Sequence, residues 1–197
     1  DEAINISSLY TEQAEGSNYE YFQFVNSSVL HRSDIYGKLN GVNSSCSLSG
    51  LTLSKDKQHS ATYINTDHAK PHCKSSQNFK SILNDMSSGV FNGRTVVQED
   101  SQKTNSRQSN KNLLLSDKAL MNSNPQLEIY ADDVKCAHGS TTGALDKEAL
   151  FYMQSRGINK EEASSLLIRG FASELINEVQ HEDCLLYTSD ADDDIRC

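Results

Sequence analysis

Short strand-like segments separated by polar turns occupy the first 144 residues of this sequence. Runs rich in β-branched, aromatic and leucine residues are interrupted by turn-forming pairs such as Asn40-Gly41 and Asn92-Gly93. No stretch of this region has convincing helical periodicity. The pattern predicts an all-β sandwich, barrel or β-solenoid, and because no clean repeat period emerges, it leaves these three architectures open. The expected strands are Tyr19–Val25, Val29–Leu39, Cys46–Leu53, Ala61–Asn65, Phe79–Leu83, Arg94–Gln98, Lys111–Ser116 and Leu127–Ala137.

Helical signals begin after residue 144. Asp146 is placed to cap a helix that runs to about Arg156, where Gly157 supplies a left-handed C′ residue. Asn159 offers a second N-cap, with Glu162 three residues further on. Apolar residues then recur at helical spacing and predict a stripe that covers its own domain or a partner. This stripe contains Ala163, Leu166, Leu167, Gly170, Phe171 and Leu175.

These changes divide the chain into three parts. We expect a β domain over 1–144 and a helical domain over 145–179. Residues 180–197 are acidic and lack an apolar period, which favours a disordered or non-native tail in which Cys184 and Cys197 have no function.

Composition excludes several classes of protein. A net charge of −9 argues against a nucleic-acid surface, which needs a basic patch. No apolar run approaches the ~20 residues that span a bilayer. The five cysteines are odd in number and irregularly spaced, so they do not indicate a disulfide framework. We therefore expect a cytoplasmic protein with no membrane segment and no nucleic-acid partner.

Cys136 and His138 form the sharpest local feature. If one strand continues through them, a period of two places both side chains on the same face. Thiolate and imidazole groups suit soft metals such as iron and zinc, but two ligands do not complete a site. The alternatives are a buried cysteine beside a hydrogen-bonded histidine, or a β-solenoid enzyme that uses the pair.

A second cluster contains His68, His72 and Cys73. Its spacing is typical of metal ligands, but Pro71 precludes a regular helix through it, so the two histidines need not converge. A polar turn is the favoured interpretation.

Several stretches together resemble the SufB/SufD family of the SUF iron–sulfur cluster assembly system. The densest one runs from Pro125 to Gly143 and includes Cys136-Ala137-His138-Gly139. The others are Asp67–Lys80, Gly89–Arg94, Gln102–Asn105, Asn112–Ser116 and Leu150–Ile158. Residues 102–112 contain no cysteine, whereas SufB carries its assembly cysteine in the corresponding stretch, so the chain is more similar to SufD members of the family than to SufB members.

The resemblance implies a mainly β protein: a right-handed parallel β-helix followed by a small C-terminal helical domain. It implies a non-catalytic scaffold that pairs with SufB through β-helix ends and docks the ATPase SufC through the helical domain. His138 would ligate a transient iron–sulfur cluster at the SufB interface, with Cys136 as the second candidate ligand. Flavin binding by the complex is a further family trait that the sequence leaves open. The alternatives are a SufB-like paralogue and the solenoid enzyme.

An open β-helix end presents unpaired strand edges. We therefore expect aggregation or homodimerisation of the isolated chain.

Overall fold

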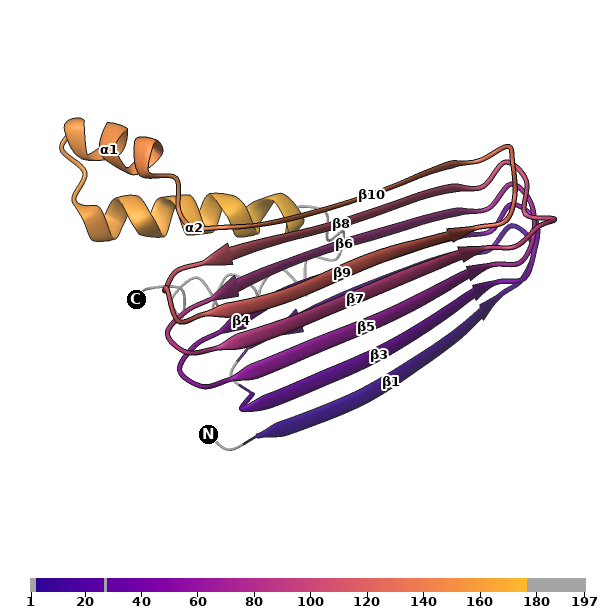
Figure 1. Ribbon diagram of the computed structural model, residues 1–197, viewed down its shortest axis with the longest axis horizontal. Helices are drawn as coiled ribbons and strands as arrows, with labels where there is room; N and C mark the ends of the chain where they lie inside the picture. The colour runs from indigo at the N-terminus through magenta and orange to yellow at the C-terminus, as the bar shows by residue number, and fades with distance from the viewer. Residues whose placement is uncertain (1–2, 27, 177–197) are drawn as a thin grey trace. The chain divides into compact units, whose positions relative to one another are not determined.

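Residues 3–26 and 28–176 are described by the computed structural model, which contains a parallel β-solenoid and two helices (Figure 1). The compact units are residues 1–142 and 143–197, each considered by itself below. Odd-numbered strands form one five-stranded sheet and even-numbered strands form the other. The elements are β1 (Ile4–Gln13), β2 (Asn18–Val25), β3 (Leu30–Leu39), β4 (Ser45–Ser54), β5 (His59–His68), β6 (Lys74–Leu83), β7 (Ser88–Val97), β8 (Asn105–Leu114), β9 (Leu120–Ile129), β10 (Lys135–Gly143), α1 (Lys147–Ser155) and α2 (Lys160–Ile176).

Each coil of the solenoid contributes one strand to each sheet, and the registered pairs are parallel. Residues stacked on neighbouring coils are 27 positions apart for Asn18 and Ser45, 29 for His59 and Ser88, and 31 for Ser75 and Ser106. This variable coil length explains why no fixed repeat period is visible in the sequence.

The corners that lead into β2, β4, β6 and β8 share one backbone conformation. A residue with positive φ stands two positions before each of β2, β4, β6 and β8: Gly16, Asn43, His72 and Lys103. A small side chain follows it, and at three of the four corners the hydroxyl of Ser17, Ser44 or Thr104 donates at 2.8 Å to the carbonyl oxygen three residues earlier. Glycine, asparagine and histidine all tolerate this left-handed conformation. Different residue types therefore occupy the same corner position, and no common sequence motif marks it.

The solenoid interior contains both apolar and polar layers. Its apolar cluster lies in the middle coils and includes Ile35, Leu48 and the ring pair Phe79–Phe91, whose centroids are 5.5 Å apart. The buried residues of β8, by contrast, are mostly polar: Ser106, Gln108, Asn110, Asn112 and Leu113. Polar side chains therefore fill the interior beneath the last coil.

One predicted strand is wrong at the last corner. The sequence suggested a single strand over Leu127–Ala137, but β9 ends at Ile129 and β10 begins at Lys135. The prediction failed because the apolar pattern continues across the corner. The turn is fixed by the backbone of Asp133, whose carbonyl oxygen accepts from Lys103 N at 2.7 Å and whose N–H donates to Gln102 Oε1 at 2.9 Å. The strand β1 was not predicted at all.

The helical unit begins as its capping residues predict. Asp146 accepts hydrogen bonds from the N–H groups of Glu148 and Ala149, and Gly157 has a φ of 91°. Asn159 Oδ1 accepts from Glu162 N at 2.8 Å. The buried face of α2 differs from the predicted stripe, because Leu166 is 44% exposed; the buried residues are Ala163, Ile168, Ala172 and Leu175.

Some predictions fall outside the described residues, namely residues 177–179 of the helical domain and the tail 180–197 with Cys184 and Cys197. Among the helices that are described, none has the length and hydropathy needed to cross a membrane.

Candidate functional site

The last strand, β10, pairs with β8 alone among the described strands (Figure 1). Its register follows from two bonds. Lys135 N donates to Thr104 O at 2.8 Å, and Asn112 Nδ2 donates to Thr142 Oγ1 at 3.2 Å. The residues Cys136, His138, Ser140 and Thr142 therefore stack on Ser106, Gln108, Asn110 and Asn112.

These four residues of β10 continue the inward-facing columns of the solenoid, because those beneath them on β8 are buried. Ser140 confirms the direction, since its Oγ donates to Ser123 Oγ of β9 at 2.7 Å. No further described strand covers β10. As a result His138 and Ser140 are exposed and Cys136 is only partly buried. We call this surface, formed by Ile129, Cys136, His138 and Ser140, the β9–β10 end.

The surroundings of Cys136 favour the protonated form of its thiol. Partial burial raises its pKa above the ordinary value, and a hydrogen bond with the backbone of Ser106 opposes that rise without cancelling it. A thiolate forms here only if a metal or a base takes the proton.

The Cys136–His138 pair is an incomplete ligand set. Both residues lie in β10 two positions apart, so the strand places them on one face as the period of two predicts. Within residues 3–26 and 28–176, no three histidine, cysteine, aspartate or glutamate residues are grouped so as to hold a metal. Metal binding at this pair therefore requires donors beyond those that the described residues bring together here.

The second cluster does not converge. His68 ends β5 fully buried, with Nε2 2.7 Å from Ser75 Oγ, and burial lowers its pKa to about 4. His72 is the exposed left-handed corner residue, and Cys73 is buried with its thiol 3.2 Å from the carbonyl oxygen of Gly41. The interpretation as a polar turn is thus confirmed.

A ladder of glutamines inside the solenoid was missed from the sequence. Gln77 and Gln108 occupy adjacent coils beneath His138, and each is at least 98% buried. Nothing in the sequence marks them, because glutamine among serines and asparagines is typical of an exposed strand face.

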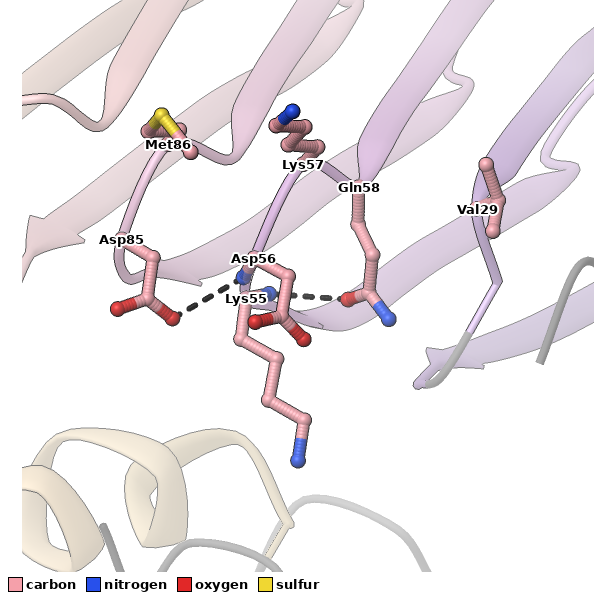
Figure 2. Close-up of a pocket in the computed structure, with 7 residues that line it drawn as sticks. All are labelled: Val29, Lys55, Asp56, Lys57, Gln58, Asp85 and Met86. Carbon is pink, nitrogen blue, oxygen red and sulfur yellow. Dashed lines mark hydrogen bonds between the residues drawn. The ribbon is translucent and has the colours of Figure 1, made fainter.

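A hollow of about 650 Å³ opens where even-numbered strands end, lined by Val29, Lys55, Asp56, Lys57, Gln58, Asp85 and Met86 (Figure 2). Its polar groups serve the turns themselves: Asp85 accepts from Asp56 N at 3.0 Å, and Gln58 accepts from Lys55 N at 2.9 Å. Cys136, in contrast, lies near the start of β10, so this hollow is separate from the Cys136–His138 pair.

These features define a class of protein: a parallel β-solenoid whose last coil displays an exposed, incomplete thiol–imidazole pair. Comparison with known families narrows the class. The family described as "SUF system FeS cluster assembly, SufBD core domain" matches residues 1–171. The chain belongs to this SufBD family, and its relatives place it with the SufD type.

Three relatives illustrate the match. The chain is 41% identical over 145 residues to the iron-sulfur cluster assembly protein SufD of Escherichia coli, covering 74% of the chain and 34% of that relative. It is 40% identical over 129 residues to a SufBD family protein of Synechocystis, covering 66% and 28%. It is 40% identical over 101 residues to SufD of Bacillus subtilis, covering 51% and 23%. The chain thus spans about a third or less of the length of these relatives.

Proposed function

We propose that this chain, a member of a cluster assembly family, is a non-catalytic scaffold subunit that shares a nascent iron–sulfur cluster with SufB at the β9–β10 end. The observation that carries the proposal is the half-site on the last coil, where His138 is exposed beside Cys136 with no third ligand among the described residues. The cluster is cargo, held only until it is transferred.

Ligand chemistry supports a shared site. Imidazole nitrogen and cysteine thiolate are both ligands of iron in iron–sulfur centres, and His138 supplies the first. Iron binding displaces the thiol proton of Cys136, whose raised pKa otherwise keeps it neutral. The remaining thiolates then come from SufB. An incomplete set also suits an assembly site, because a cluster held by two proteins is released when they separate.

The backbone of β10 is suited to pair with a partner strand. Lys135 N bonds to β8, and alternate residues of a parallel strand direct their N–H groups to opposite sides, so those of Cys136, His138 and Ser140 are directed to the free edge. Added strands bind exposed edges of this kind.

The neighbouring edge of β9 is less suited to pairing. Even-numbered residues along β9 donate toward the β7 side, as Leu120 N does at 3.0 Å and as Tyr130 N, directly after the strand, does at 2.9 Å. Pro125 is odd-numbered, so the N–H that it lacks belongs to the free edge. A partner strand therefore gains a full ladder at β10 and an interrupted one at β9.

Co-expression with SufB and SufC tests this pairing. Ser140→Pro removes one N–H from the free edge of β10 and leaves pairing with β8 intact, as Pro125 does naturally in β9. Ser140→Ala is the matched control, since it loses the same hydroxyl but keeps the N–H. We expect Ser140→Pro to lose co-purified SufB and Ser140→Ala to retain it. Equal recovery of SufB with both variants would exclude pairing at this edge.

The helical unit is the proposed docking site for SufC. Phe151 and Tyr152 of α1 are 72% and 58% exposed, which is unusual for adjacent aromatic residues on a helix without a partner. The cytoplasm is the proposed location of the complex. Flavin is an expectation from the family resemblance, and no residue of this chain is assigned to it.

A further inference from the structure

Two buried glutamines form a hydrogen-bonded ladder that points toward His138. Gln77 Nε2 donates to Thr66 Oγ1 at 3.1 Å and to Thr95 Oγ1 at 3.2 Å. Gln108, on the next coil, donates from Nε2 to Gln77 Oε1 at 3.3 Å. The NH₂ group of Gln108 therefore faces the coil beneath it and is directed away from the last coil.

The orientation of the Gln108 amide is fixed by its surroundings. Its Nε2 also lies 3.2 Å from the backbone carbonyl oxygen of Gly93 and 2.8 Å from Thr95 Oγ1. A backbone carbonyl only accepts hydrogen bonds, so the group facing it must be the NH₂ and not the oxygen.

The oxygen of the same amide has no partner. Gln108 is 2% exposed, and Oε1 is buried without a hydrogen bond. A buried carbonyl that lacks a donor costs about 1–3 kcal/mol, so the unpaired oxygen calls for a donor, either a water or a neighbouring side chain. The next residue in this column, by the register of β8 and β10, is His138.

We propose that Gln108 is a positioning residue for His138: the two side chains are not hydrogen-bonded in this structure, and a change of the His138 rotamer would let Oε1 accept the N–H of one imidazole nitrogen, fix the tautomer, and leave the other nitrogen to bind iron. Only the role of the second nitrogen, which is to bind iron, rests on the proposed function; the contact between Gln108 and His138 does not depend on it. Histidine ligands commonly donate their other N–H to an oxygen acceptor, which sets the ring orientation. Here the acceptor belongs to the coil beneath and is held by the glutamine ladder.

The tautomer of His138 is the direct test, measured by long-range ¹H–¹⁵N correlation NMR on the ¹⁵N-histidine-labelled 197-residue chain without metal. We expect one dominant tautomer for His138. His72, exposed at its corner, serves as the internal reference, where we expect both tautomers. A mixture of tautomers at His138 in the wild-type chain, like that expected at His72, would overturn the proposal. The donor to Gln108 Oε1 would then be a bound water only.

Two variants then assign the cause. Gln108→Met keeps the length of the side chain and removes the acceptor, so His138 should become a tautomeric mixture. Gln77→Met removes the same group one coil further from His138 and should leave its tautomer fixed. A single tautomer that persists in folded Gln108→Met would also overturn the proposal.

The functional consequence is measured separately. In the complex with SufB and SufC, Gln108→Met should weaken iron retention about 10–100-fold, the usual effect of removing the oxygen partner of a ligating histidine. The tautomer depends on no metal, whereas cluster loading by His138→Ala tests the proposed function. A fixed tautomer with normal loading in His138→Ala would contradict the proposed function and leave the Gln108 contact standing.

Discussion

The backbone of Gly93 lies so close to Gln77 inside the solenoid that a Cβ added to Gly93 would be only 2.8 Å from Oε1 of Gln77. The ring of Phe91 would be 2.9 Å away on another side. Gln77 has little freedom to move, because its amide is bonded to Thr66 and Thr95. The glutamine ladder beneath His138 therefore requires glycine at position 93.

Gly93→Ala should destabilise the solenoid by about 1–3 kcal/mol, the usual cost of overpacking a core. Denaturant unfolding monitored by circular dichroism measures the change. Gly139→Ala is the matched control, because it is also a strand glycine and nothing lies within 4 Å of its added Cβ. Equal unfolding midpoints for the two variants would contradict this prediction, because the glutamine ladder would then accommodate the added methyl group without loss of stability.

The buried imidazole of His68 should make folding stability dependent on pH. Its pKa is lowered from 6.5 to about 4, so between these values the unfolded chain binds a proton that the folded chain does not. Stability is then fully present above about pH 6.5 and falls as the pH drops toward 4. The loss assigned to His68 is at most about 3 kcal/mol.

The variant His68→Gln cannot titrate and should remove this part of the pH dependence, whereas His72→Asn at an exposed corner should leave it unchanged. The free energy of unfolding is measured for each between pH 4 and 7. Other histidines and the carboxylates contribute equally to all three proteins. Parallel curves for wild type and His68→Gln would contradict the assignment.

The aromatic pair on α1 should contribute to SufC binding. Phe151→Ser removes a side chain that is 72% exposed and is not part of a buried face, so the helix should keep its fold. We expect the variant to retain SufB and lose most of the SufC in a co-purification. Lys147→Ser, on the same helix, is the control. Retention of SufC by Phe151→Ser would place that contact elsewhere.

The isolated chain should self-associate through exposed strand edges. Light scattering should give a mass above the 21.8 kDa of one chain. Ile129→Lys places a charge at the β9–β10 end, where Ile129 is 41% exposed, and Ile6→Lys does so on β1, where Ile6 is 65% exposed. The variant that lowers the mass identifies the associating end. A monomer in the wild type would contradict this prediction.

The sequence alone marked Cys136 and His138 as the candidate site, but it predicted less of the scaffold that supports them. Cys136 and His138 were identified because chemistry and a period of two depend only on local order. The position of these two residues on the last coil was not predicted, because the corner at Asp133 lacks a glycine and the apolar pattern runs through it. The family resemblance, not periodicity, selected the solenoid from the three open architectures.

The glutamine ladder could not be predicted for a different reason. Burial of Gln77 and Gln108 depends on pairing between coils 31 residues apart, and coil length varies along the chain. Their polarity therefore favoured an exposed face when considered alone. His72 was ambiguous because histidine suits two different roles. It is a common metal ligand, but here it occupies a corner with positive φ, a conformation that histidine tolerates.

Cluster loading in the complex tests the central claim most directly. Wild type, His138→Ala and the control His72→Asn would each be co-expressed with SufB and SufC and purified without oxygen. Bound iron, acid-labile sulfide and the visible absorbance of the cluster would then be measured per complex. The proposed function predicts that His138→Ala assembles the complex but loses most of its cluster, while His72→Asn matches wild type. Full loading of the His138→Ala complex would contradict it.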